Sequence, residues 1–188
     1  MDNTNSLYEG RLVRLGPLDH EKDPPVVARW TCDPLLRSVL ADVARPLSPE
    51  VVRRLLEKVE KQMEETKNLF HFTLRLRDDN RLVGLARIFW IDFHNGTGVL
   101  NLGIGDSSDR RRGYGSDALN LLLRFAFDEL NLHRLSVWTS ADNFPFIQMV
   151  GKAGFEEEAR RREASFHAGS YWDVILMGLL RTKWEEKC

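Results

Sequence analysis

The stretch DRRRGYGSDALNLLLRFAF, residues 109–127, joins a loop of three arginines and two glycines to a strongly apolar segment. The apolar segment predicts a buried helix from about Gly113 to Leu130. A helix N-terminus presents unpaired N–H groups and a partial positive charge, and it therefore attracts anions. Gly113 and Gly115 have no Cβ, so a ligand could approach their backbone closely. This combination suits a pyrophosphate group.

The arginines of this loop, Arg110–Arg112, leave more than one interpretation open. They could hold a further phosphate, or they could be a solvated run of charge ahead of a buried helix. A P-loop is excluded, because the chain contains no G-x-x-x-x-G-K-[ST]. A dinucleotide-binding turn is an alternative, since Gly113, Gly115 and Ala118 fit a relaxed G-x-G-x-x-A pattern. Against it, residues 106–112 separate this turn from the preceding strand.

The rest of the chain predicts an α+β fold in which helices pack on a central, mainly antiparallel sheet. Segments with alternating apolar and polar residues predict strands at residues 10–18, 69–77, 81–91, 97–105, 133–140, 155–167 and 171–180. Short turns favour an antiparallel meander for the strands within residues 69–105. Helices are expected after the caps Asp23 and Asp33, each followed by proline, and at residues 48–68, 113–130 and 143–154.

Composition points to one soluble domain, spanning residues 1–188 with an ordered core of about residues 8–184. The 27 basic and 28 acidic residues nearly balance, which argues against nucleic-acid or membrane binding. The 2 cysteines cannot form a disulfide framework, and neither a signal peptide nor a membrane span is evident. We therefore expect a cytoplasmic protein. His71, His94, His167 and Cys32 lack metal-ligand spacing, so no metal and no role is assigned to them.

The loop and its surroundings resemble the GNAT N-acetyltransferase superfamily. In GDSSDRRRGYGSDAL, the acetyl-coenzyme A motif [RQ]-x-x-G-x-[GA] falls on Arg110, Gly113 and Gly115. The resemblance is to the RimJ/RimL-like branch, which includes ribosomal-protein N-terminal acetyltransferases. It continues through NLHRLSVWTSADN, GKAGFEEE and RREASFHAGSYWDVILMGLLRTKW, and covers roughly residues 12–184.

This resemblance implies acetyl-coenzyme A as co-substrate and a sheet of about seven strands with helices on both faces. The strand before the motif would splay from the strand after the motif helix, leaving a V-shaped opening for the pantetheine arm. The implied cofactor-binding residues are Leu102, Gly103, Ile104, Gly105, Arg110, Arg111, Arg112, Gly113, Tyr114, Gly115, Ser116 and Asn143. Asn143 could also be a helix N-cap.

The catalytic residues cannot be assigned from the sequence. Where ribosomal-protein acetyltransferases of this branch carry a serine and a glutamate, this chain has Phe146 and Ser165. Glu163 is a candidate base, because a period of two would place it on the strand face of Ser165. Tyr171 is a candidate proton donor, and Asn101 stands where relatives often have a carboxylate. Each of the three also has a purely structural interpretation.

The implied reaction is direct acetyl transfer to a primary amine, carried by a protein N-terminus or by a small molecule. The acceptor pocket would involve the aromatic-rich residues 86–96 and the helices around residues 30–40, although core packing could account for most of these side chains. Two alternatives remain open. One is a catalytically weak acyl-coenzyme A sensor, and the other is a dinucleotide-binding oxidoreductase with a parallel sheet. A monomer or homodimer is expected.

Overall fold

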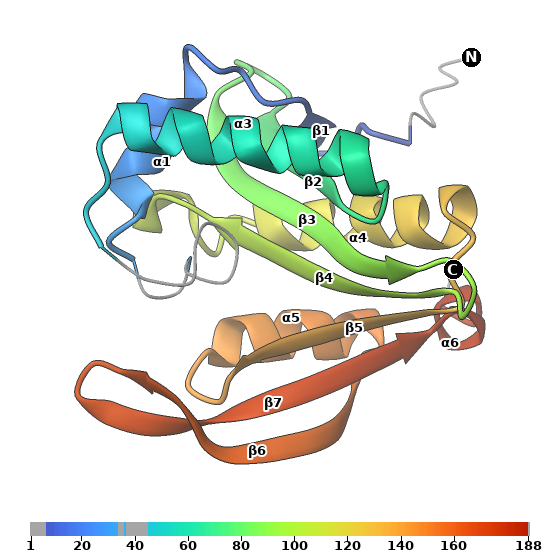
Figure 1. Ribbon diagram of the computed structural model, residues 1–188. Helices are drawn as coiled ribbons and strands as arrows, with labels where there is room; N and C mark the ends of the chain where they lie inside the picture. Colours follow the sequence, from blue (N-terminus) through green and yellow to red (C-terminus); the bar gives the residue numbers. More distant parts are fainter. Residues whose placement is uncertain (1–6, 34–35, 37–44, 188) are drawn as a thin grey trace.

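A single mixed sheet of seven strands organises the computed structural model, which describes residues 7–33, 36 and 45–187 (Figure 1). The strand order is β1-β2-β3-β4-β5-β7-β6. The strands are β1 (Val13–Gly16), β2 (Phe70–Leu76), β3 (Leu82–Asp92), β4 (Thr97–Ile104), β5 (Arg134–Ser140), β6 (Glu156–His167) and β7 (Ser170–Leu180). The expected α+β architecture is confirmed.

Helices cover both faces of the sheet (Figure 1). They are α1 (Asp23–Trp30), α3 (Pro49–Thr66), α4 (Tyr114–Arg124), α5 (Phe144–Ala153) and α6 (Arg181–Glu185). Leucines of α4 and Val150 of α5 pack into one core, whereas α1 and α3 bury Val27, Trp30, Val52 and Leu56 on the opposite face. No helix in the described ranges is both long and apolar enough to cross a membrane.

The helix starts follow the sequence in α3 but not in α1. Ser48 caps α3, because its side chain accepts a hydrogen bond from the Val51 amide at 3.3 Å. The cap expected at Asp23 is wrong, since Asp23 is the first helical residue and its carboxylate accepts from Arg75 at 2.7 Å. The carboxylate of Asp23 is thus bound by the largely buried Arg75 side chain and by the Asp19 amide, and it does not cap α1. The helix expected after Asp33 lies outside the described residues.

The sheet has a parallel pair at its centre, β4 with β5. The other strand pairs in the described chain are antiparallel, from β1 to β4 and from β5 through β7 to β6. Pairing of β4 with β5 ends at Val99 and Ser136, and beyond these residues the two strands separate (Figure 1). The expected splay is therefore confirmed, and the parallel, doubly wound sheet of an oxidoreductase is wrong for this chain.

Strand β6 forms the free edge beyond β7. From Glu156 to Ala164 every residue is exposed, and seven of these nine carry charge. Its pairing with β7 shifts register between Glu157 and Ala159 and again between Arg161 and Ser165. This edge is polar and irregular.

Candidate functional site

The N-terminus of α4 lies against the end of β4 that pairs with β3 but not with β5. A Cβ added to Gly115 would stand 3.2 Å from Sδ of Met149 in α5, 3.8 Å from Cδ1 of Leu102 and 3.9 Å from Cγ1 of Ile104. Because these neighbours belong to β4 and α5, the glycine loop is placed at the opening between the two central strands. The segments that the sequence singled out for the cofactor, residues 102–105 and 113–116, are thus brought together.

The loop backbone requires glycine at Gly113. This residue has φ of 87°, in the left-handed region that other residues adopt only with strain, and it is the N-cap of α4. Among the residues that the structure describes, no side chain caps the first turn of α4. The amide groups that begin this helix therefore remain available to an anion, as the sequence suggested.

The three arginines of the loop have different surroundings. Arg110 donates from Nε to the Ile104 carbonyl at 3.1 Å and from a terminal nitrogen to the Gly105 carbonyl at 2.8 Å, and it forms an ion pair with Asp33. Its side chain thereby fixes the loop to the end of β4. Arg111 and Arg112 are exposed and make no hydrogen bond or ion pair with the described residues. These two are the arginines that a phosphate could recruit.

An ion pair that the sequence analysis missed anchors the start of the loop. Arg81 holds Asp109 with two hydrogen bonds of 2.6 and 2.9 Å, and Asp109 is only 4% exposed. These bonds keep the pKa of the Asp109 carboxyl below its usual value, although burial opposes the shift. The two residues lie 28 positions apart in sequence, so no local sequence pattern predicts the contact.

Gly105 is buried for reasons of packing. A Cβ at this position would stand 1.9 Å from the Trp30 ring, so only glycine fits beneath the indole. The same indole donates a hydrogen bond to Asp106 at 3.2 Å. Trp30 therefore joins α1 to the loop that leads into α4.

Asn143 lies at the start of α5, beside the end of β5. Its backbone oxygen accepts from the amides of Phe146 and Ile147, while its side chain donates to Oγ1 of Thr139 at 3.1 Å. It is the N-cap residue by position, but within the described part of the chain its side chain makes no cap hydrogen bond. Phe146, at the position of the missing serine, is partly buried against the core.

The candidate catalytic residues occupy three unlike environments. Glu163 is exposed with φ of 49°, within the register shift between Arg161 and Ser165. The period of two that placed Glu163 on the face of Ser165 therefore does not hold in β6. Tyr171 is 66% exposed and packs on Phe166, with ring centroids 4.9 Å apart.

Asn101 is 3% exposed and lies opposite Arg87 on β3. On the other side of Arg87 lies His71 of β2, which is buried. Burial, reinforced by the charge of Arg87, lowers the pKa of His71 to about 4, so this histidine is neutral at pH 7. In the described ranges no three His, Cys, Asp or Glu side chains are grouped so as to hold a metal ion.

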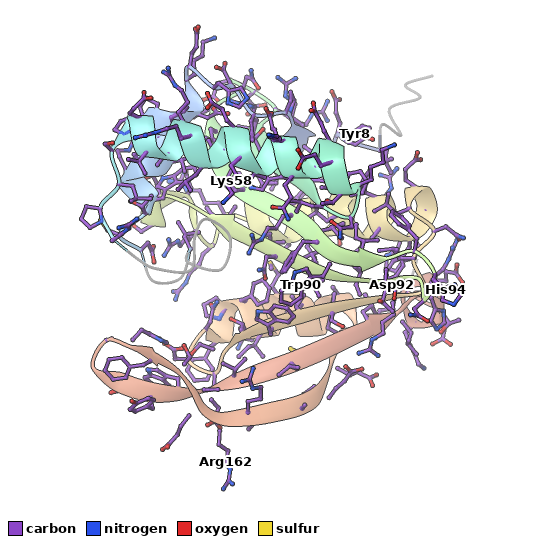
Figure 2. The ribbon with its side chains drawn as sticks, viewed as in Figure 1. Tyr8, Lys58, Trp90, Asp92, His94 and Arg162 are labelled. Atoms are coloured by element: carbon purple, nitrogen blue, oxygen red, sulfur yellow. The ribbon has the colours of Figure 1, made fainter. Side chains whose placement is uncertain are left out.

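The aromatic-rich segment divides between core and surface. Phe89 is buried, whereas Trp90 is 67% exposed and has φ of 50° (Figure 2). Trp138 reaches from β5 to both of them, with ring centroids 5.9 Å from Phe89 and 5.2 Å from Trp90. Since Trp138 follows the last residue of β5 that pairs with β4, this aromatic group lies where the two strands separate.

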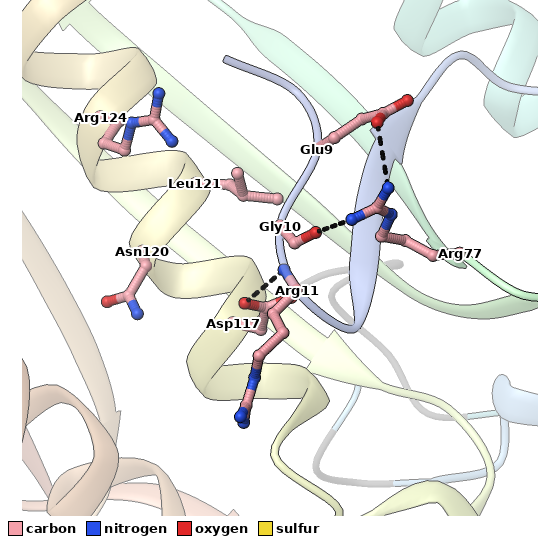
Figure 3. Close-up of a pocket in the computed structure, with 8 residues that line it drawn as sticks. All are labelled: Glu9, Gly10, Arg11, Arg77, Asp117, Asn120, Leu121 and Arg124. Carbon is pink, nitrogen blue, oxygen red and sulfur yellow. Dashed lines mark hydrogen bonds and ion pairs between the residues drawn. The ribbon is translucent and has the colours of Figure 1, made fainter. Parts of the chain in front are cut away.

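A separate surface pocket of about 350 Å³ lies between α4 and the segment that precedes β1 (Figure 3). Asp117 of α4 accepts hydrogen bonds there from the amides of residues 11–13, at 2.7 to 3.1 Å. Arg77 donates to the Gly10 carbonyl at 3.1 Å and pairs with Glu9 at 3.6 Å. These groups form hydrogen bonds and an ion pair with one another. The pocket therefore marks the contact between α4 and the segment that precedes β1.

Comparisons with known proteins agree with this geometry. Residues 13–156 match the family model described as an acetyltransferase (GNAT) domain. The SPbeta prophage-derived uncharacterized N-acetyltransferase YokL of Bacillus subtilis is 31% identical over 137 residues, which is 73% of this chain and 75% of that protein. Spermidine N(1)-acetyltransferase of Vibrio cholerae is 26% identical over 103 residues, covering 55% of this chain and 59% of the relative.

A solved structure shares the fold over nearly its whole length. The crystal structure of spermidine N-acetyltransferase from Vibrio cholerae in complex with CoA and spermine superposes with a TM-score of 0.77. The match covers 92% of this chain and 98% of that one, at 20% identity. At this identity, the likeness concerns the arrangement of strands and helices.

Proposed function

Since this chain belongs to the GNAT acetyltransferase family and is an acetyl-coenzyme A-dependent N-acetyltransferase, we propose that its acceptor is a primary amine of a peptide N-terminus or of a small molecule. The observation that most directly supports acetyl transfer at this site is the separation of β4 from β5 beyond Val99. This opening lies beside the first turn of α4, which no described side chain caps. The opening lies between two strands and adjoins an anion-attracting helix end. A thioester with a long diphosphate-bearing arm fits such a site.

The residues present fit acetyl-coenzyme A. We propose that the amides of residues 113–116 hold the pyrophosphate, that Arg111 and Arg112 contact a further phosphate, and that residues 102–105 line the pantetheine arm. When bound, the co-substrate supplies an acetyl group activated as a thioester. Along the edge of β4 beyond Val99, the backbone has no partner on β5, so an amide there can donate to the developing oxyanion.

The nature of the acceptor is a further part of the proposal. The resemblance to the RimJ/RimL-like branch supports a peptide N-terminus, and the spermidine acetyltransferases among the relatives support a polyamine. The exposed Trp90 beside Trp138 offers an apolar surface for either class at the point where the opening begins. We also propose a cytoplasmic monomer or homodimer, although one neighbour of the same fold is a dodecamer.

A thiol-release screen tests this function. Acetyl-coenzyme A is incubated with the protein and a panel of peptides with free N-termini, polyamines and aminoglycosides, while calorimetry measures binding of coenzyme A. Release of thiol together with an acetylated amine is expected for at least one class. Binding of coenzyme A without release in any mixture would favour an acyl-coenzyme A sensor, and absence of binding would exclude both.

A further inference from the structure

Three polar side chains from two distant segments meet beside the end of β5. Nε2 of His167 lies 2.8 Å from Oδ2 of Asp142, and Nδ1 of the same ring lies 3.4 Å from Oγ of Ser165. His167 and Ser165 belong to β6, whereas Asp142 lies in the turn between β5 and α5. The contact therefore joins the terminal hairpin to the turn that carries Asn143.

This cluster lies at the open end of the central splay. β5 and β7 pair from Arg134 with Leu180 to Ser140 with Val174, so the start of β7 extends past the last residue of β5. The hairpin turn that follows His167 lies at the same end. Because β4 and β5 separate toward this end, the cluster flanks the β5 side of the opening.

The imidazole of His167 is held firmly and is partly accessible. Its side chain is 14% exposed, and that of Asp142 is 24% exposed. The ring stacks on Trp172 with centroids 5.9 Å apart and an interplanar angle of 22°. Nε1 of Trp172 is buried without a hydrogen-bond partner among the described residues, which is unusual for a buried donor.

The hydrogen bonds define which ring nitrogen can act as a base. Burial alone would raise the pKa of Asp142, but the neighbouring Ser140 hydroxyl and the hydrogen bond with His167 outweigh burial, and the pKa lies below its usual value. Asp142 is therefore ionised at neutral pH and accepts a hydrogen bond from the Nε2–H group. In neutral His167 the lone pair is then on Nδ1, which faces Ser165.

Other charged groups of the hairpin have partners away from His167. Asp173 of β7 pairs with Arg160 at 3.5 Å and accepts from the Glu163 amide at 3.0 Å. Glu163 itself is exposed. Among the described residues, Asp142 is the charged side chain in contact with His167. It is thus the local charge that can stabilise a protonated imidazole.

We propose that His167 is the general base of acetyl transfer and that Asp142 is a positioning residue which fixes its ring; this inference rests on the proposed function. Nδ1 takes one proton from the acceptor ammonium, directly or through the Ser165 hydroxyl, leaving a neutral amine and an imidazolium paired with Asp142. The amine nitrogen forms a bond to the acetyl carbon, and the carbon–sulfur bond then breaks. The second amine proton goes to the leaving thiolate, and the imidazolium returns its proton to water.

The test uses three amines as probes: the peptide Ser-Gly-Gly, spermidine, and the weakly basic O-methylhydroxylamine, which is already neutral at pH 7. Thiol release is measured for the wild type, His167→Gln and Asp142→Asn from about pH 6 to pH 9. For the peptide at pH 7, His167→Gln should lose about tenfold in kcat/KM, because roughly a tenth of an α-amino group with a pKa near 8 is already neutral in solution; for the more basic spermidine the loss should be about a hundredfold or more. The loss for the peptide should fall below threefold near pH 9, where an α-amino group is mostly neutral.

Asp142→Asn should show the same pH-dependent loss at smaller size, and both variants should keep a near-normal rate with O-methylhydroxylamine. His133→Gln is the matched control and should behave as the wild type, because exposed His133 directly precedes β5, at the end where β5 pairs with β4 and opposite the hairpin turn. Glu163→Gln should lose less than tenfold at every pH. Circular dichroism and coenzyme A calorimetry establish that each variant is folded and binds the co-substrate.

A loss in His167→Gln that is equal at all pH values and for all three amines would overturn the proposal, since it would indicate a structural role. A loss below threefold at pH 7 would also overturn it, as would a thousandfold loss in Glu163→Gln. If the wild type releases thiol with none of the amines, the proposed function fails and this inference falls with it. If the wild type acetylates an amine and both His167→Gln and Asp142→Asn keep its rate, the inference about His167 is wrong while the proposed function stands.

Discussion

Arg110 donates to the carbonyls that end β4, while Arg111 and Arg112 extend from exposed positions of the same loop. Replacing Arg111 or Arg112 with alanine should weaken acetyl-coenzyme A binding by about 1 to 3 kcal/mol, because a charge-assisted hydrogen bond is lost. The effect should be larger at low salt, since these charges are screened by ions. Calorimetric titration at two salt concentrations measures it, with thermal unfolding unchanged.

Arg110→Ala serves as the contrasting variant. Because its side chain binds two carbonyls and Asp33, its removal should lower the melting temperature as well as the affinity. Equal affinity of the wild type and a folded Arg111→Ala, Arg112→Ala double variant at low salt would exclude both arginines from the cofactor site.

Gly113 combines a left-handed backbone with a position at the start of α4. Gly113→Val should cost about 1 to 2 kcal/mol of stability through its positive φ, and it should also block the approach of a phosphate. Gly169→Val is a suitable control, since Gly169 has φ of 76° and open space around its missing Cβ. The control should share the loss of stability but keep normal acetyl-coenzyme A affinity. Similar affinities in both folded variants would remove Gly113 from the site.

At the scale of elements, the ion pair of Arg81 with Asp109 fastens the β2–β3 hairpin to the turn Ser107–Asp109. Asp109→Asn should destabilise the fold by about 1 to 3 kcal/mol at pH 7, since a bidentate charged pair is broken around a buried group. Asp79→Asn is the control: Asp79 also pairs with Arg81, at 3.8 Å, but its side chain is 58% exposed. It should change stability little.

The pair also gives stability a pH dependence with a definite sign. The folded pKa of Asp109 is lowered, so the ionised carboxylate favours the folded state and contributes fully above its unfolded pKa of about 4. That contribution is lost as the pH falls through the folded pKa. Urea unfolding from about pH 6 to pH 2 should show a steeper acid loss in the wild type than in Asp109→Asn. Parallel curves would contradict this role.

Most elements were predictable because their signals are local. Ser48 and Pro49 mark the start of α3, and short turns mark the antiparallel meander. The details that sequence reasoning missed depend on distant partners. Asp23 accepts a hydrogen bond from Arg75, which is 52 residues away in sequence. His167 forms a hydrogen bond with Asp142, which is 25 residues away.

The difference between local signals and distant contacts also explains which parts of the candidate site were predictable. The family resemblance placed residues 102–105 and 110–116 around one cofactor, and the structure brings this loop and β4 together, because a helix start and its preceding strand are neighbours in sequence. The register shift around Glu163 could not be foreseen, since a bulge depends on the partner strand as much as on its own residues. Periodicity was reliable in the core strands and failed at this exposed edge.

At the scale of the whole molecule, one buried ion pair connects the N-terminal helix to the sheet. Asp23 of α1 and Arg75 of β2 have side chains that are 1% and 13% exposed. Asp23→Ala should destabilise the protein by about 3 to 5 kcal/mol, because the guanidinium is left without its partner. Denaturant titration should show the loss, and Glu21→Ala, at an exposed position before the same helix, should not. A change below 1 kcal/mol for Asp23→Ala would show that water replaces the carboxylate.

The free edge of β6 bears on how the protein behaves when concentrated. An unpaired edge strand is a template on which another chain can add a strand and begin aggregation. Here the side chains from Glu156 to Glu163 are largely charged, and two register shifts break the regular spacing that an added strand would need. Charge and bulges together therefore oppose the addition of a second molecule to this edge. The irregularity that made the periodic prediction for β6 fail is thus also a feature that opposes aggregation through this edge.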